Sequence, residues 1–110
     1  MKVKDIVKKL NLELVVEADL NQKITGGYTG DLLSNVMAKA KAGNVWITIQ
    51  SHQNVIAVAL LVEISAVIIA EDFSVDDKAK QRAQQKGINI LRSQDNAYQI
   101  AGKLFEEGID

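Results

Sequence analysis

The sequence contains no cysteine and no proline, and its only histidine is His52. Without cysteine the chain can form no disulfide, no thiolate metal site and no cysteine nucleophile. The absence also fits a reducing compartment, so we expect a cytoplasmic protein. Any chemistry that depends on an imidazole has to use His52 alone.

Long apolar stretches and an excess of charge of one sign are missing as well. The most apolar segment, residues 55–70, is interrupted by Glu63 and Ser65 and is shorter than the ~20 residues that cross a bilayer. Residues 1–11 mix lysines through their apolar positions, unlike a signal peptide. The formal net charge is -1, with basic and acidic residues interleaved, so no basic face is apparent. We therefore expect neither a membrane nor a nucleic acid as partner.

The 110 residues, 47% hydrophobic and 25% charged, are typical of one folded domain spanning residues 1–110. Apolar residues at helical spacing alternate along the chain with β-prone runs. The spacing predicts helices near residues 3–10, 31–43, 54–64, 78–86 and 95–108, and strands near 12–18, 45–50, 66–70 and 88–91. We predict an α/β domain with three layers, α/β/α, around a mainly parallel sheet.

Single residues predict the limits of some elements. Residues 66–70 lack alternation, which is typical of a central strand covered on both faces. Asp31 is expected to cap the helix after it, and Ser74 with Asp77 resembles a capping box. Gly43 and Gly87 are expected to end the helices that precede them.

Three glycines within residues 26–30 mark the most distinctive segment, which we expect to be a loop. Backbone N–H groups of such a turn can bind phosphate, and neighbouring hydroxyls can add donors. The candidate ligand-binding residues are Thr25, Gly26, Gly27, Tyr28, Thr29, Gly30, Asp31 and Ser34. A P-loop would have Lys and Ser or Thr after the last glycine, where this chain has Asp31, whose carboxylate repels phosphate. The sequence is compatible with two interpretations of this segment, a site for a small anionic, nucleotide-like ligand and a purely structural turn.

A second polar cluster follows the strand predicted at residues 45–50. Its candidate ligand-binding residues are Thr48, Gln50, His52 and Asn54. Open α/β sheets bind ligands beyond the carboxyl ends of their strands, so we expect both clusters to line one edge and to contact the same ligand. His52 could carry a proton, or it could bond to the backbone of its own loop.

No motif for metal binding or catalysis is present. The chain has no HExxH, no EF-hand spacing and no Gly-x-Ser-x-Gly around its serines. We therefore predict no catalytic residue, no metal and no cofactor. A small enzyme built on residues 25–31 and 48–54 is the alternative.

The helix predicted at residues 54–64 is apolar nearly all round, with Glu63 as its only charge. An outer helix of a small domain usually keeps a polar face toward water. Either the helix is buried within the monomer, or its surplus apolar face joins two subunits in a homodimer. The candidate interface residues are Leu60, Leu61, Val62 and Trp46.

Three parts of the sequence together resemble the DRTGG domain family. They are the run at residues 25–34, residues 45–48 with Gln50, His52 and Asn54, and the segments 87–91 and 101–104. Lys23 and Ile24 stand where the family's name has Asp and Arg, although Thr25, Gly26 and Gly27 agree.

The resemblance implies a three-layer α/β/α fold and a role in regulation, ligand sensing or dimerisation. In HPr kinases, phosphotransacetylases and CBS-domain pyrophosphatases this module accompanies other domains and is not the catalytic part. The resemblance therefore implies a role in metabolic regulation, with a metabolic enzyme as the expected protein partner. A purely structural dimerisation module that binds no ligand is a further alternative.

Overall fold

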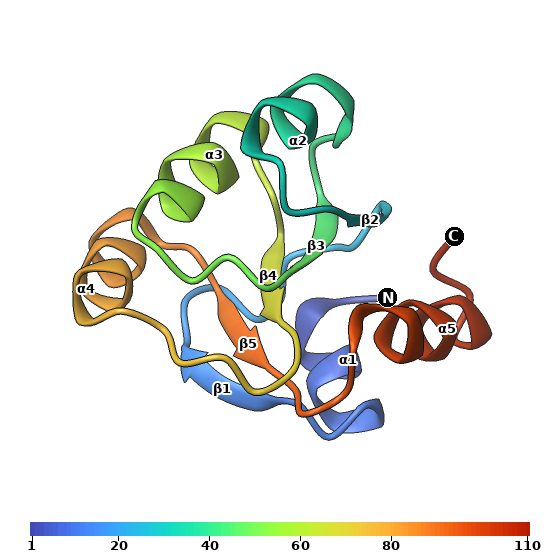
Figure 1. Ribbon diagram of the computed structural model, residues 1–110. Helices are drawn as coiled ribbons and strands as arrows, with labels where there is room; N and C mark the ends of the chain where they lie inside the picture. The colour runs from blue at the N-terminus through green and yellow to red at the C-terminus, as the bar shows by residue number, and fades with distance from the viewer.

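The computed structural model describes all residues, 1–110, as one chain of alternating helices and strands (Figure 1). The helices are α1 (Val3–Lys9), α2 (Leu33–Lys39), α3 (Asn54–Val62), α4 (Asp77–Lys86) and α5 (Ala97–Glu106), and the strands are β1 (Glu13–Val16), β2 (Gly26–Thr29), β3 (Asn44–Thr48), β4 (Ala66–Ile69) and β5 (Ile90–Arg92). Each helix and strand expected from the sequence is present, and β2 is an additional strand.

The five strands form one sheet in the order β1-β5-β4-β3-β2. Strands β2 to β5 run parallel, whereas β1 pairs antiparallel with β5 at one edge. The parallel strands follow one another across the sheet because a helix connects each to the next, as right-handed crossovers require. The α/β class and the mainly parallel sheet are confirmed.

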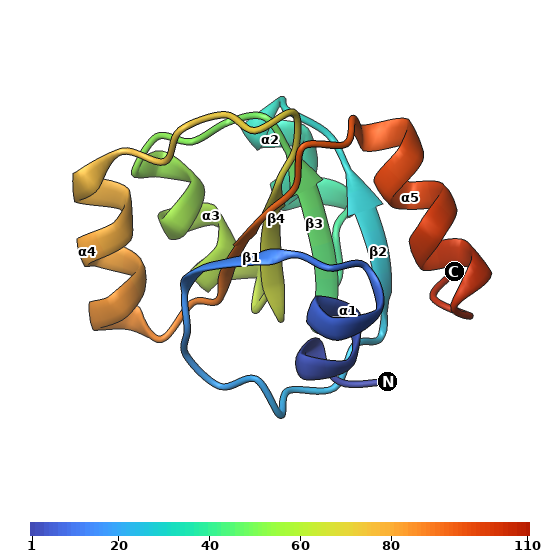
Figure 2. The same ribbon diagram turned by 90° about the horizontal axis from the view of Figure 1, so that it is seen from below.

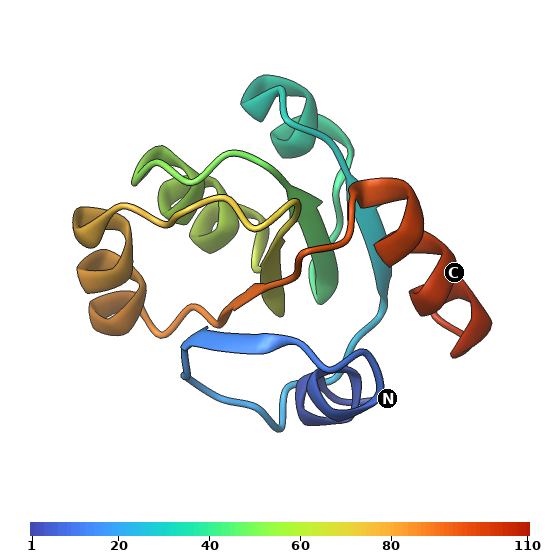
Figure 3. The same cartoon turned by 60° about the horizontal axis from the view of Figure 1, so that its bottom comes forward.

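Helices cover both faces of the sheet (Figures 2 and 3). On one face α2, α3 and α4 pack through side chains such as Val36, Ile56 and Ala79. On the other face α1 and α5 pack through side chains such as Ile6 and Leu104, and both chain termini lie on this side. This arrangement gives the three predicted layers, with an apolar core on each side of the sheet.

The central strands are buried along their full length. Every residue of β3 and β4 is buried, because helices cover both of their faces. The prediction of a central strand at residues 66–70 is confirmed. Trp46, a candidate interface residue, is 0% exposed, and its indole Nε1 donates a hydrogen bond to the Gly30 carbonyl at 2.9 Å. Its assignment to a subunit interface is wrong, since the monomer itself encloses the ring.

Several predicted helix ends differ in the structure. Asp31 does not cap α2, which has Leu32 at its N-cap and no side-chain cap, and the same helix ends at Lys39 instead of at Gly43. Ser74 caps nothing, because α4 begins after Asp76. The carboxylate of Asp31 is not available as a cap because it accepts hydrogen bonds at the end of β3.

The ends of α4 and α5 follow sequence rules more closely. Gly87 ends α4 in the left-handed region, with φ 73°, as predicted. At the start of α5, Asn96 and Gln99 form a reciprocal capping box, in which each side chain accepts a hydrogen bond from the backbone N–H of the other.

The glycine-rich segment is an edge strand and not a loop. Gly26 to Thr29 form β2 and pair with β3. A Cβ atom on Gly26 would lie 2.9 Å from the backbone oxygen of Asp110, so this glycine is needed for a close approach of the chain. The expectation of a loop at residues 26–29, either as a phosphate-binding turn or as a structural turn, is therefore wrong.

Gly43 requires glycine for two reasons, its φ of 83° and the closeness of Thr25, whose Cγ2 would lie only 2.5 Å from an added Cβ atom. Gly87 has a similar φ, and a Cβ atom added there would meet nothing within 4 Å, so Gly87→Ala is a matched control. We expect Gly43→Ala to lower the free energy of unfolding by about 1–3 kcal/mol more than Gly87→Ala, because Thr25 must move. Urea unfolding with matched m-values measures the difference. Equal losses would contradict this account.

Candidate functional site

The carboxyl ends of β2 to β5 meet at one edge of the sheet, and the loops that follow them carry most of the polar residues predicted to bind a ligand. At this edge or beside it lie Thr29, Gly30, Asp31, Ser34, Thr48, Gln50, His52 and Asn54. Tyr28 and Gly27 lie within β2. The structure thus brings most of the two predicted clusters to the same edge.

Thr25 and Gly26 are at the opposite, amino edge of the sheet. The Thr25 hydroxyl donates to the carbonyl of Ala42 at 2.7 Å and accepts from Asn44 Nδ2 at 3.2 Å. These bonds fix the chain at the start of β2 and β3. A ligand at the carboxyl edge cannot contact them, because the length of a strand separates the two edges.

Asp31 connects the loop after β2 with the end of β3. Its carboxylate Oδ1 accepts hydrogen bonds from the Thr48 hydroxyl at 2.8 Å and from the Ile49 N–H at 3.0 Å. The side chain of Gln50 donates back to the Asp31 carbonyl at 3.1 Å. Asp31 thus fixes the relative positions of two loops at the edge.

The imidazole of His52 is exposed and bonds within its own loop. Its Nδ1 accepts a hydrogen bond from the Asn54 N–H at 3.3 Å, at the start of α3. The interpretation of His52 as a loop histidine bonded to the backbone is confirmed. No carboxylate forms an ion pair or hydrogen bond with the ring.

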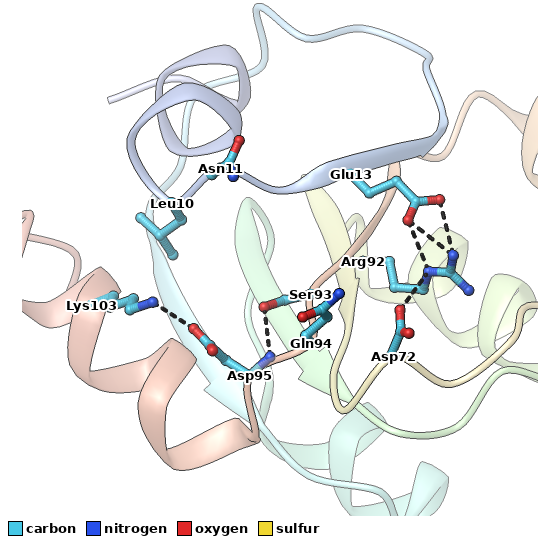
Figure 4. A pocket seen from close by; sticks show the side chains of 9 residues that line it. All are labelled: Leu10, Asn11, Glu13, Asp72, Arg92, Ser93, Gln94, Asp95 and Lys103. Carbon is cyan, nitrogen blue, oxygen red and sulfur yellow. Dashed lines mark hydrogen bonds and ion pairs between the residues drawn. The ribbon is translucent and has the colours of Figure 1, made fainter.

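A groove lies at the carboxyl end of β5, between the turn that joins α1 to β1 and the loops that follow β4 and β5. Helices α2, α3 and α4, which follow β2, β3 and β4, lie on one face, whereas α5, which follows β5, lies on the other. Adjacent strands whose connections leave toward opposite faces open a crevice between them, and α/β proteins bind ligands there. The groove is lined by Leu10, Asn11, Glu13, Asp72, Arg92, Ser93, Gln94, Asp95 and Lys103, and has a volume of about 360 Å³ (Figure 4).

Arg92, the last residue of β5, holds one end of the groove together. Its guanidinium donates to both carboxylate oxygens of Glu13 on β1, at 2.9 and 3.2 Å from Nη2, and it forms an ion pair with Asp72 at 3.4 Å. Its side chain is 25% exposed, compared with 54% for Glu13 and 55% for Asp72. A largely shielded cation is thus held by two well-exposed carboxylates.

Lys103 and Asp95 form an ion pair at the other end of the groove, where α5 begins. The Ser93 hydroxyl accepts a hydrogen bond from the Asp95 N–H at 3.0 Å and orders the segment after β5. The groove therefore has a charged pair at each end, with Ser93 and Gln94 between them.

The backbone around the groove is strained. Glu71 and Asp72, in the turn after β4, have φ angles of 59° and 57°, and Asn11 has a φ of 52°. A left-handed conformation costs a residue other than glycine on the order of 1 kcal/mol or more and persists where the surroundings impose it, often at functional sites. The N–H groups of Glu71 and Asp72 donate to the carbonyls of Asp95 and Ser93, both at 2.8 Å. These bonds join the two loops and maintain the strained turn.

No sequence pattern predicted this groove. Glu13 and Arg92 are 79 residues apart, so no local pattern connects them. Open α/β sheets bind ligands beyond the carboxyl ends of their strands, and this rule indicates residues 93–95 after β5 as well as the polar residues after β3. The position of β1 beside β5 had no sequence signal.

The described residues hold no group of three or more His, Cys, Asp or Glu side chains placed to bind a metal ion. None of the helices is both long and apolar enough to span a membrane.

The contribution of Asp31 can be measured through its bond to Thr48. We expect Asp31→Ala to lower the free energy of unfolding by about 1–3 kcal/mol, because the buried Thr48 hydroxyl and the Ile49 N–H lose their acceptor. Asp31→Asn retains an acceptor oxygen and should cost less. A double-mutant cycle with Thr48→Val, followed by urea unfolding, should give a coupling energy of at least about 0.5 kcal/mol. Additive losses would show that the bond contributes nothing.

The fold has a clear structural relative. A search of solved structures finds the CBS and DRTGG domains of the regulatory region of Clostridium perfringens pyrophosphatase, complexed with its activator, diadenosine tetraphosphate, with a TM-score of 0.70 and 11% sequence identity. The match covers 94% of this chain and 45% of that one, so the chain spans less than half the length of its relative. At this identity the likeness concerns the fold alone. Comparison with curated proteins gives no significant match.

A family model settles the relationship that the fold suggests. The model of the DRTGG domain matches residues 5–106, nearly the whole chain from α1 to the end of α5. The resemblance seen in the sequence is thereby confirmed, although Lys23 and Ile24 differ from the residues of the family's name. The chain belongs to the DRTGG domain family.

Proposed function

We propose that this chain is a non-catalytic regulatory module that binds a small ligand carrying an anionic group at the carboxyl edge of its sheet. The family match over residues 5–106 carries the proposal. It is supported by the fold, which is shared with the regulatory region of a pyrophosphatase that binds an activator. In this role the chain would control a metabolic enzyme and would not itself transform the ligand.

The hydrogen bonds at the end of β3 favour a structural role over proton transfer. The Asp31 carboxylate accepts hydrogen bonds from Thr48 and Ile49, and the Nδ1 atom of His52 accepts one from the backbone. A general base needs a nucleophile or substrate proton within reach and is usually oriented by a third group. His52 and Asp31 are not joined in this way, so the arrangement favours a binding module over a small enzyme.

The candidate ligand-binding residues that remain are those at the carboxyl edge. They are Thr29, Gly30, Asp31, Ser34, Thr48, Gln50, His52 and Asn54. The groove at the carboxyl end of β5 adds a concave surface to this edge. Thr25 and Gly26 are no longer candidate ligand-binding residues because they lie at the amino edge of the sheet.

A homodimer formed through α3 is part of the proposal. Val55, Ile56, Val58 and Ala59 of this helix face the core, whereas Leu60 is 45% and Leu61 is 70% exposed, and Val62 is half-buried. The apolar surplus seen in the sequence therefore faces outward. In a two-fold symmetric dimer the same apolar patch of each subunit would pack against that of the other, which is the simplest way to bury it.

If the module is regulatory, the isolated chain should transfer no phosphate from radiolabelled ATP with Mg²⁺ to protein or small-molecule acceptors. Phosphoryl transfer needs cations around the phosphates and a residue that positions the nucleophile. The glycine-rich segment, which in a kinase could form a phosphate-binding loop, is strand β2 in this chain. A kinase of known activity in the same buffer is the positive control. Labelled product that forms in proportion to the concentration of the chain, with turnover, would refute the non-catalytic assignment.

The homodimer predicts that Leu61→Lys yields a folded monomer, because a charge facing an apolar interface weakens association more than folding. Tyr98→Lys is the matched control, since Tyr98 is an exposed large side chain on α5, on the opposite face. Light scattering should give a dimer mass for the unmodified chain and for Tyr98→Lys. A monomer mass for the unmodified chain at high micromolar concentration would exclude the interface.

A further inference from the structure

Arg92 has the chemistry of an anion-binding residue. Its planar guanidinium presents paired donors that match a carboxylate or phosphate, and in the groove these donors face Glu13 in a fork-like contact. Glu13 is the more exposed partner, so its carboxylate can turn into water at little cost when another anion arrives. Glu13 thus occupies the place that a ligand carboxylate would take.

The charges of the groove restrict the ligand. Glu13, Asp72 and Asp95 supply three carboxylates, whereas Arg92 and Lys103 supply two cations. A ligand with several negative charges would meet a groove whose own net charge is already negative, and repulsion opposes its binding. A ligand with one anionic group on Arg92 and one cationic group beside Asp72 or Asp95 adds no net charge, and it leaves only the displaced, solvent-exposed Glu13 without a partner.

The size of the groove agrees with this choice. Its volume of about 360 Å³ is at the lower end of ligand pockets, which span roughly 300–1,000 Å³. Apart from Leu10 its lining is polar, and Ser93, Gln94 and Asn11 offer hydrogen bonds between its charged ends. Such a space suits a compact polar molecule better than a dinucleotide.

We propose that the groove between Arg92 and Lys103 binds a small zwitterion of amino-acid size, with its carboxylate on Arg92 in place of Glu13 and its ammonium group beside Asp72 or Asp95. The inference rests on the proposed function and names the ligand class and the site within it. The strained turn at Glu71 and Asp72 belongs to the same site, because it holds the Asp72 carboxylate against Arg92.

Isothermal titration of the full chain with the proteinogenic amino acids tests the proposal, with acetate, inorganic phosphate and ATP as further probes. At least one amino acid should bind saturably, and more tightly than acetate or phosphate. Arg92→Gln should weaken this binding by roughly tenfold or more, because the charge-assisted contact is lost. Arg82→Gln on α4, which removes an arginine that forms no ion pair in the structure, should leave it unchanged.

Glu13→Gln is the decisive second variant, and it remains informative if Arg92→Gln does not fold. Removing the competing charge should tighten amino-acid binding by about two- to fivefold, within the range of an exposed ion pair. Unchanged or weaker amino-acid binding in Glu13→Gln would overturn the proposal that the ligand carboxylate replaces Glu13 on Arg92.

The three ligand outcomes separate this inference from the proposed function. Amino-acid binding that Arg92→Gln leaves intact would overturn the site but retain ligand sensing. ATP or phosphate binding without amino-acid binding would overturn the zwitterion and retain a ligand-binding module. No saturable binding by any probe would overturn both.

Discussion

The burial of β3 and β4 on both faces is the constraint on which the rest of this structure depends. A parallel sheet between two helical layers has no open face, so the polar residues of the sheet and its loops gather where the strands end. Asp31, Gln50 and His52 follow β2 and β3, and Asp72 and Asp95 follow β4 and β5. The same burial leaves outward-facing helix surfaces, such as that of α3, as the other place where a partner could bind.

The loops after β2 and β3 and the loops after β4 and β5 are held together in different ways. After β2 and β3, Asp31 joins the loops through short bonds to Thr48 and Ile49. After β4 and β5 the connections leave toward opposite faces, and a groove forms although backbone bonds join the turn at Glu71 to Asp95. The groove thus lies where the helical connections leave the sheet toward opposite faces, as is typical of ligand sites in open α/β sheets.

Predictions that depended on periodicity agreed with the structure, and predictions that depended on single side chains often did not. The helical stripe of α5 and the unbroken apolar run of β4 are repeated signals, and the burial they predict follows directly from the hydrophobic effect. Asp31 and Trp46 were assigned from local chemistry, as a helix cap and an interface residue. Their real partners, Thr48 and the Gly30 carbonyl, come from neighbouring strands or loops and are set by tertiary contacts.

The sequence by itself determined the α/β class, the central position of residues 66–70, the apolar surplus of α3 and the membership of a family, because these follow from patterns repeated along the chain. Only the tertiary structure decided that the glycine-rich segment is an edge strand, and that Glu13 meets Arg92. The physical reason is that strand order and register bring together residues up to 79 positions apart, and no local propensity encodes such a pairing.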